Sequence, residues 1–190
     1  MTGRFIFEWF SLLLLIGLGI YTMWVIKNEK LNYLKNGRSI EFKKFKFLVP
    51  KWWGEVPTNS ENELIFKRLD TKYEWAATFT WSSEQNAGDL IELFKAHIVK
   101  RKILFDEDSS IIYNPSDFKE GALIQSGLYE IVRVEGTATE DSQERLYYDA
   151  FLIREKKSGS YLYAESKSSV LNGLVEGPYF EDVMIRTELV

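Results

Sequence analysis

No cysteine occurs in this chain of 190 residues, and His97 is its single histidine. The absence of cysteine excludes disulfides, thiolate nucleophiles and cysteine-ligated zinc or iron–sulfur sites. It carries no information on the redox compartment, because cysteine-free chains occur in oxidising and reducing spaces alike. With one histidine, most proton-transfer or nucleophilic chemistry would fall to carboxylates, Lys, Tyr or Ser.

The motifs of several enzyme classes are also missing. The sequence has no phosphate-binding glycine loop, no G-x-S-x-G elbow and no H-E-x-x-H helix. A catalytic His97 would need an acid to orient it, and no partner is evident, so a satisfied, half-buried histidine is the preferred interpretation. The acids fall mostly on expected turns and strand exteriors, and no catalytic pair stands out. We expect no cofactor, and the sequence favours a protein that is not an enzyme.

One long apolar segment is present, from Phe5 to Ile26, with Glu8 as its single charge. At a rise of about 1.5 Å per residue a helix of this length spans roughly 33 Å, enough to cross a hydrocarbon core of about 30 Å. The part from Trp9 to Ile26 carries no charge, and a buried core helix rarely runs 18 residues without one. Residues 1–27 are therefore predicted to be a transmembrane anchor that places the chain in a lipid bilayer.

This segment differs from a cleaved signal peptide. A signal peptide has an apolar region of about 7–15 residues, followed by small residues at the cleavage site. The uncharged run here is longer and ends among Tyr21, Met23 and Trp24. Trp9 at one end, with Tyr21 and Trp24 at the other, suits rings that lie at the two headgroup levels. We interpret the segment as an uncleaved, single-pass anchor.

Charge is distributed unevenly along the rest of the chain. Residues 27–46 carry seven Lys or Arg against two Glu, whereas residues 47–190 carry 16 basic and 25 acidic side chains. A basic juxtamembrane stalk, 28–38, would contact anionic headgroups. Nucleic acid is not an expected partner, because its binding depends on basic patches. The basic flank favours a cytoplasmic domain, but long domains translocate regardless of charge, so the side of the membrane stays open.

Residues 39–190 have the length of one globular domain. Asp89 is expected to cap an amphipathic helix through Lys102, and a last helix is expected over 179–187, after Gly177-Pro178. Both faces of 145–154 are apolar, as in a central strand covered on two sides. The predicted fold class is α+β: an N-terminal transmembrane helix plus one antiparallel sheet covered by helices, an α/β/α sandwich. Alternating apolar residues, joined by turns at 70–72, 140–143 and 156–159, predict strands at 45–49, 63–69, 73–81, 111–113, 128–137, 145–154 and 160–166.

Two groups of residues are candidates for binding. Trp52 and Trp53 stand in a turn; such a pair can stack on a ligand, but more often the rings form a lid over one end of a core. If exposed, they are the candidate partner-binding residues. Asp106 and Asp108 belong to the densest acidic cluster and are candidate ligands for a hard cation, with a solvated loop as the preferred alternative. The cluster is not an EF-hand loop, because Ile111 occupies the glycine position, and no metal site is expected.

The order of elements resembles the PsbP-like α/β/α sandwich family, which includes DcrB-like envelope proteins. The resemblance covers Phe42 to Val190 and implies a non-enzymatic binding or assembly factor. An uncleaved anchor departs from the soluble and lipid-attached members of that family. The residues that carry the resemblance are the opening Phe45–Trp52 with its Pro-x-Trp exit, the strands Tyr147–Arg154 and Tyr161–Ser166, and the closing Tyr179-Phe180 helix.

We therefore expect a single-pass, membrane-anchored, non-enzymatic domain that contacts another membrane or envelope protein. Two alternatives stay open. A membrane-tethered hydrolase would bring two carboxylates together in a deep cleft and raise their pKa values. A small-ligand or cation-binding sensor would use Asp106 and Asp108, and its ligand would stabilise the fold.

Overall fold

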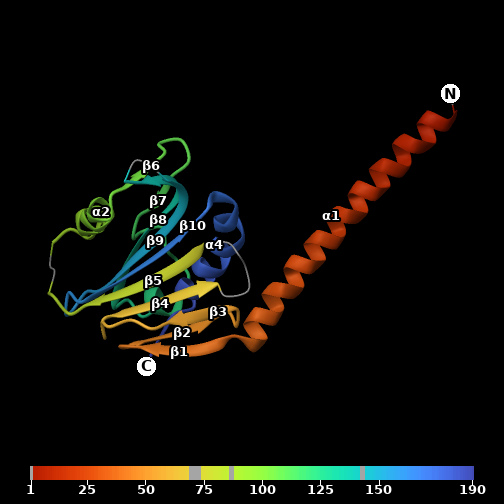
Figure 1. Ribbon diagram of the computed structural model, residues 1–190. Coiled ribbons are helices and arrows are strands. Elements are labelled where there is room, and N and C mark those ends of the chain that lie inside the picture. Colours follow the sequence, from red (N-terminus) through yellow and green to blue (C-terminus); the bar gives the residue numbers. More distant parts are fainter. Residues whose placement is uncertain (1, 69–73, 86–87, 142–143) are drawn as a thin grey trace. The chain divides into compact units, whose positions relative to one another are not determined.

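The computed structural model describes residues 2–68, 74–85, 88–141 and 144–190, with no side-chain placement for residues 2–6. The chain divides into two compact units, residues 1–37 and residues 38–190 (Figure 1). The predicted turn at 70–72 and part of the turn at 140–143 lie outside the described residues.

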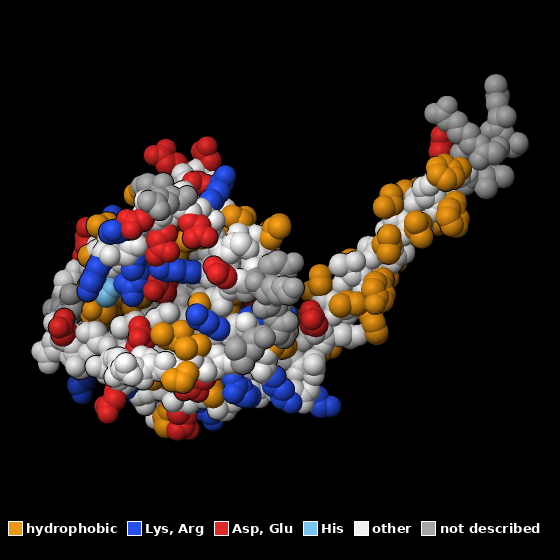
Figure 2. All heavy atoms as spheres, viewed as in Figure 1, with side chains coloured by type: hydrophobic (Ala, Val, Ile, Leu, Met, Phe, Trp, Pro, Cys, Tyr) orange, Lys and Arg blue, Asp and Glu red, His pale blue; other side chains and the backbone are white. Residues whose placement is uncertain are grey.

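The first unit is one continuous helix, α1 (Thr2–Asn36). The expected stalk at 28–38 is helical as far as Asn36. Residues 27–36 include Lys, Glu and Leu, which favour a helix, and they contain no Gly or Pro to interrupt it. The helix ends before Gly37, whose N–H donates to the carbonyl of Tyr33 at 2.7 Å. From Phe7 onward the helix is long and apolar enough to cross a membrane, and hydrophobic side chains cover much of its visible surface (Figure 2). Trp9, Tyr21 and Trp24 are all exposed on it.

Antiparallel strands make up most of the second unit, in two sheets. The larger sheet has the order β3-β4-β5-β10-β9-β8-β6, with β7 on the same edge of β8 as β6, farther along that strand. The smaller sheet has the order β1-β2-β11. The strands are β1 (Arg38–Phe42), β2 (Phe45–Val49), β3 (Trp53–Val56), β4 (Glu63–Arg68), β5 (Trp75–Ser82), β6 (Ile103–Phe105), β7 (Ile111–Tyr113), β8 (Tyr129–Glu140), β9 (Glu144–Glu155), β10 (Tyr161–Ser168) and β11 (Glu188–Leu189).

The prediction of a single sheet is wrong, and the turn at Lys43-Lys44 explains why. In the sequence, Ile40 and Phe42 alternate on one phase and Phe45, Phe47 and Val49 on the other. In the structure this change of alternation reflects a two-residue hairpin turn, with Phe42 paired to Phe45 and Lys43 in the left-handed region at φ 57°. The hairpin β1–β2 forms its own sheet with β11 and lies over the larger one. Phe45 and Phe47 are fully buried there, and the Phe47 ring lies 4.9 Å from that of Phe79 in β5.

Helices lie on both faces of the larger sheet, as expected for this α+β fold (Figure 1). α2 (Leu90–Lys100) packs Leu90 and Phe94 against one face. Asp89 caps it as predicted, because its carboxylate accepts the N–H of Glu92 at 2.9 Å. α4 (Val170–Ile185), the short α3 (Ala122–Gln125) and the smaller sheet contact the elements of the other face. Phe180 of α4 lies 6.1 Å from the Phe79 ring.

Strand β9 is the central strand that the sequence predicts. Its even-numbered residues, such as Tyr148 and Leu152, are buried in the core beneath α2. Its odd-numbered residues face the other layer, where the Phe151 ring lies 5.7 Å from the ring of Phe180 in α4. Because both faces are buried, the strand needs a covering layer on each side.

The last helix begins nine residues earlier than predicted, and Pro178 lies inside it. Gly177 and Pro178 look like helix breakers in the sequence. In the structure, Gly173 and Gly177 face the side chain of Tyr147 in β9, and a Cβ atom on Gly173 would lie 2.3 Å from the Tyr147 ring. The glycines therefore permit a close approach of helix to sheet and do not end the helix.

Replacement of each glycine by alanine tests this contact. Alanine in a helix interior gains about 1 kcal/mol of stability over glycine. Gly173→Ala should nevertheless lower the free energy of unfolding by roughly 1–3 kcal/mol, because its methyl group overpacks against Tyr147. Gly177→Ala is the matched control, since its Cβ would meet Tyr147 at 3.5 Å, an ordinary contact, and should be neutral or stabilising. Urea unfolding measures both, and equal effects would contradict the account.

Candidate functional site

The outer side of α4 carries a row of exposed apolar residues, here called the α4 stripe: Leu171, Leu174, Val175 and Pro178. The side chains of Leu171, Leu174 and Val175 are 77%, 65% and 54% exposed. Their spacing of i, i+3, i+4 and i+7 places all four on one side of a helix. Contiguous exposed apolar surface of this kind is a feature of sites that contact proteins or membranes.

Trp52 and Trp53 lie beside α4 and differ in burial. Trp53 is fully buried, stacks 4.3 Å from Trp75 and donates its indole N–H to Glu176 of α4 at 2.8 Å. Trp53 is thus part of the lid over the core and offers no exposed ring to a partner. Trp52 is half-buried, lies edge-on 5.1 Å from Tyr179, and donates to the same carboxylate at 3.3 Å. Of the predicted pair, Trp52 alone reaches the surface.

Glu176 connects this corner of the fold. Its side chain is 1% exposed and accepts hydrogen bonds from both indoles and from Arg68. A buried carboxylate requires several donors, and these three groups supply them. The sequence gives only a weak signal for these contacts, because Glu176 lies more than a hundred residues from Trp53 and Arg68.

A second group of exposed aliphatic residues, here called the edge patch, lies on α2 and on β6 and β7, the two strands that pair with the same edge of β8. Among the described strands, β6 and β7 are paired on one side only, to β8. Their outward backbone groups are therefore open to another strand. The patch consists of Val99 (72% exposed), Leu104 (59%), Ile111 (54%) and Ile112 (52%).

His97 belongs to a polar network between α2 and β10. Its Nδ1 accepts from Arg101 at 3.3 Å, which leaves the Nε2–H to donate to the Tyr161 oxygen at 3.1 Å, and its ring stacks on Tyr163 at 4.7 Å. Burial, together with the charges of Arg101 and Lys100, lowers the pKa of His97 to about 4. The ring is therefore neutral near pH 7 and serves as the satisfied, half-buried histidine that the sequence favours.

Arg101 continues this network into the sheet. Its Nε lies 2.6 Å from a carboxylate oxygen of Glu165, and its guanidinium stacks over Tyr163 at 4.1 Å. The hydroxyl of Tyr148 donates to Glu165, and the hydroxyl of Tyr163 therefore donates to Tyr148 at 2.8 Å. Burial raises the pKa of both tyrosines, so their hydroxyls stay protonated as hydrogen-bond donors.

A second buried network, absent from the sequence prediction, centres on Arg133 in β8. Its guanidinium donates twice to Asp149 in β9, at 3.0 and 2.9 Å. It also forms ion pairs with Glu135 in β8 and with Glu181 in α4. Burial raises the pKa of Asp149 to about 7, and the hydrogen bonds from Arg133 oppose that rise. The network attaches α4 to the sheet.

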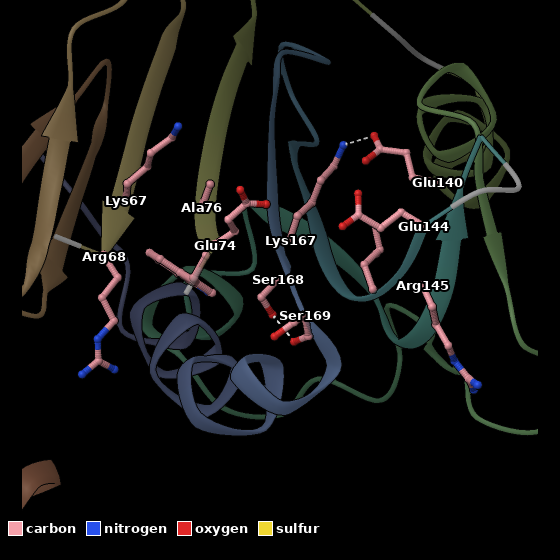
Figure 3. Close-up of a pocket in the computed structure, with 12 residues that line it drawn as sticks. Lys67, Arg68, Glu74, Ala76, Glu140, Glu144, Arg145, Lys167, Ser168 and Ser169 are labelled. Atoms are coloured by element: carbon pink, nitrogen blue, oxygen red, sulfur yellow. Dashed lines mark hydrogen bonds and ion pairs between the residues drawn. The ribbon is translucent and has the colours of Figure 1, made fainter. Parts of the chain in front are cut away.

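A groove of about 500 Å³ opens near the start of α4, and Figure 3 shows Glu74 and Glu144 on either side of Lys167. Lys167 is held by Glu140, with 2.6 Å between Nζ and Oε1. Three acids line the groove, Glu74, Glu140 and Glu144, of which Glu140 is engaged with Lys167. Asp149, a carboxylate whose pKa is raised by burial, is held against Arg133 and does not line this groove. Asp149 therefore does not form the acid pair in a cleft that the hydrolase alternative predicts.

Asp106 and Asp108 are not brought together as a cation site. Asp106 accepts from Arg145 and from Thr137, both at 2.7 Å. Asp108 is exposed. Within the part of the chain that the structure describes, no three His, Asp or Glu side chains cluster as metal ligands would.

Comparisons with known proteins bear on the fold. No protein-family model and no curated protein matches the chain. A mutant of the protein Mog1 aligns with a TM-score of 0.53 and 10% sequence identity, over 82% of this chain and 96% of its own. A Pseudomonas aeruginosa protein of unknown function aligns with a TM-score of 0.45 and 10% identity, over 78% of this chain and 93% of its own. Over the aligned part, the chain thus has an α/β fold similar to that of the Mog1 mutant.

The lowered pKa of His97 predicts a pH dependence of stability. Between about pH 4 and 6.5 the unfolded chain binds more protons at this residue than the folded chain does, so the free energy of unfolding rises with pH in this window. His97→Gln should flatten that rise by about 1 kcal/mol, a value reduced by solvent screening at this partly buried ring. Urea unfolding at pH 4.5 and 6.5 measures the difference. Carboxylates titrate equally in the wild type and in His97→Gln, so a difference between the two pH dependences reports on His97. An identical rise in the free energy of unfolding in both proteins would contradict the lowered pKa of His97.

The two tryptophans predict unequal costs of truncation. Trp53→Ala should lower the free energy of unfolding by about 3–5 kcal/mol, because it opens a cavity and removes a donor from buried Glu176. Trp52→Ala should cost roughly 1 kcal/mol, since that ring is half-exposed. Equal losses in urea unfolding would show that the two rings share one environment, contrary to the structure.

Proposed function

We propose that this chain is a single-pass membrane protein whose α+β domain binds another membrane or envelope protein without catalysis. The observation that carries the proposal is α1, which is apolar over most of its length and has aromatic rings near both ends of the apolar run. Trp and Tyr at these positions favour the two headgroup levels of a bilayer. Because α1 ends at Asn36 and the domain begins at Arg38, the anchor would keep the domain at the membrane.

The polar groups of the domain support a binding role over catalysis. The perturbed side chains His97, Asp149 and Tyr148 are each engaged by neighbours within the fold. Groups held in this way fix helices to a sheet and are poorly placed to meet a substrate. The resemblance to the PsbP-like family implies the same kind of role, a binding or assembly factor.

The edge patch is the surface that we assign to the protein partner. It combines four exposed aliphatic side chains with strand edges that are open for pairing. A partner segment added there as a strand would gain main-chain hydrogen bonds, while aliphatic contacts would determine specificity. The two edge strands are only three residues long, which limits pairing between copies of this chain.

Site-specific photo-crosslinking in native membranes tests the proposal. A photoreactive residue in place of Leu104 or Ile112 should form an adduct of one mass with one integral membrane protein, because both positions lie in the edge patch. The matched control is Lys95 on α2, which is also exposed but charged and outside the patch. Adducts at all three positions, or at none, would contradict the assigned surface.

The same membranes test the anchor. The full-length chain should resist alkaline carbonate extraction and keep its N-terminal residues in the mature protein, as expected for an uncleaved helix. Release by carbonate, or a mature chain that begins after Ile26, would refute membrane anchoring.

A further inference from the structure

The α4 stripe is not covered by any described part of the second unit, and the charges nearest to it on the helix are engaged. Glu176 points inward and binds Trp53 and Arg68. In the turn after Pro178, Glu181 binds Arg133 at 2.8 Å and Asp182 binds Arg186 at 2.6 Å. The row from Leu171 to Pro178 therefore extends about 10 Å along the helix as a continuous apolar surface.

Two amphipathic rings border this surface. Tyr179 follows Pro178 directly, and the Trp52 ring lies edge-on to it at 5.1 Å. Both side chains are half-buried. Trp and Tyr are the residues that concentrate at the boundary between acyl chains and headgroups, because each joins a large apolar ring to one polar group.

Cations surround the tryptophan end of this border. The Arg68 guanidinium lies 5.9 Å from the Trp52 ring, and Arg38 donates to the carbonyl of Trp53. Lys51, next to Trp52 in the chain, is exposed. Glu176, the carboxylate that binds Arg68 and both indoles, is 1% exposed, whereas the Lys51 side chain is exposed, so positive charge faces solvent here. Positive charge of this kind complements anionic phospholipid headgroups.

We propose that the α4 stripe, with Trp52 and Tyr179, docks on the anionic surface of the bilayer to which the chain is anchored. Aliphatic side chains at the centre, Trp and Tyr at the boundary and cations at the margin match the acyl, interfacial and phosphate layers of a leaflet. The inference rests on the proposed anchor, because a row of four side chains suffices only when a tether keeps the local lipid concentration high. The edge patch then stays available to the protein partner.

The absence of cysteine permits a direct test on the full-length chain. Leu174→Cys is labelled with an environment-sensitive fluorophore, and the protein is reconstituted in vesicles of phosphatidylcholine and phosphatidylglycerol that carry nitroxide-labelled lipid. Val99→Cys is the matched control, an exposed aliphatic position at the end of α2. Leu13→Cys, within the apolar run of α1, reports on the anchor itself. Thermal unfolding confirms that each variant is folded.

The fluorophore at position 174 should show blue-shifted emission and lose intensity to the nitroxide lipid, whereas the one at position 99 should do neither. Adding Lys51→Glu to Leu174→Cys should reduce the quenching in anionic vesicles, but not in vesicles of phosphatidylcholine alone.

Three outcomes would overturn the inference or its basis. If aqueous iodide quenches the fluorophore at position 174 and nitroxide lipid does not, the α4 stripe is not docked. If neither iodide nor nitroxide lipid quenches it, a protein covers the α4 stripe, either a second copy of this chain or a partner. If nitroxide lipid does not quench the fluorophore at position 13, α1 is not a membrane anchor and the proposed function is refuted. If nitroxide lipid quenches at position 13 but not at position 174, the anchor stands and docking alone is refuted.

Discussion

The close approach of α4 to β9 is the constraint on which the rest of the domain depends. Gly173 allows the Tyr147 ring to lie against the helix backbone, and no larger residue fits there. Glu181 and Glu176 then fix the helix at two further points, to Arg133 in β8 and to Trp53 in β3. With the inner side of α4 determined by these contacts, helical geometry alone points the residues of the α4 stripe outward.

The buried polar networks act as attachments between layers. Arg101 and Glu165 join α2 to β10, and Arg133 joins β8 and β9 to α4. A buried ion pair contributes little net stability compared with apolar packing, but removing one partner is costly, so such pairs favour one arrangement of the layers over others. Burial at such an attachment raises the pKa of Asp149, although its hydrogen bonds with Arg133 oppose that rise.

The sequence predicts those elements whose signals are local. Alternation identifies β9 and β10, and Asp89 marks the start of α2, because each pattern lies within a few residues. The start of α4 could not be read in this way, since the meaning of Gly173 depends on Tyr147, which is distant in sequence. The second sheet was missed for a similar reason: the change of alternation at Lys43 locates a break in the strand, but not the layer that the next strand joins.

The candidate surfaces followed the same division. The α4 stripe could not be predicted while its helix was expected to begin at Tyr179, although its spacing is clear once the helix is extended to Val170. The sequence favoured a lid over the core for the tryptophan pair, but it could not identify the carboxylate that binds Trp53, because Glu176 belongs to that same unpredicted turn of helix. Had the start of α4 been predicted correctly, the α4 stripe would have replaced the tryptophan pair as the leading candidate for a binding surface.

Two exposed apolar surfaces on one small domain would be a liability for a freely diffusing protein, because such surfaces promote aggregation. A membrane anchor changes that balance. Tethering confines the domain to a thin layer in which lipid and membrane-protein partners are concentrated, so contacts too weak to form in solution become populated. Each surface can then stay small: a few aliphatic side chains on α4, and two three-residue strands at the sheet edge. Weak surfaces that act only together with an anchor confine binding to the membrane, because the domain released from its helix would lose both contacts.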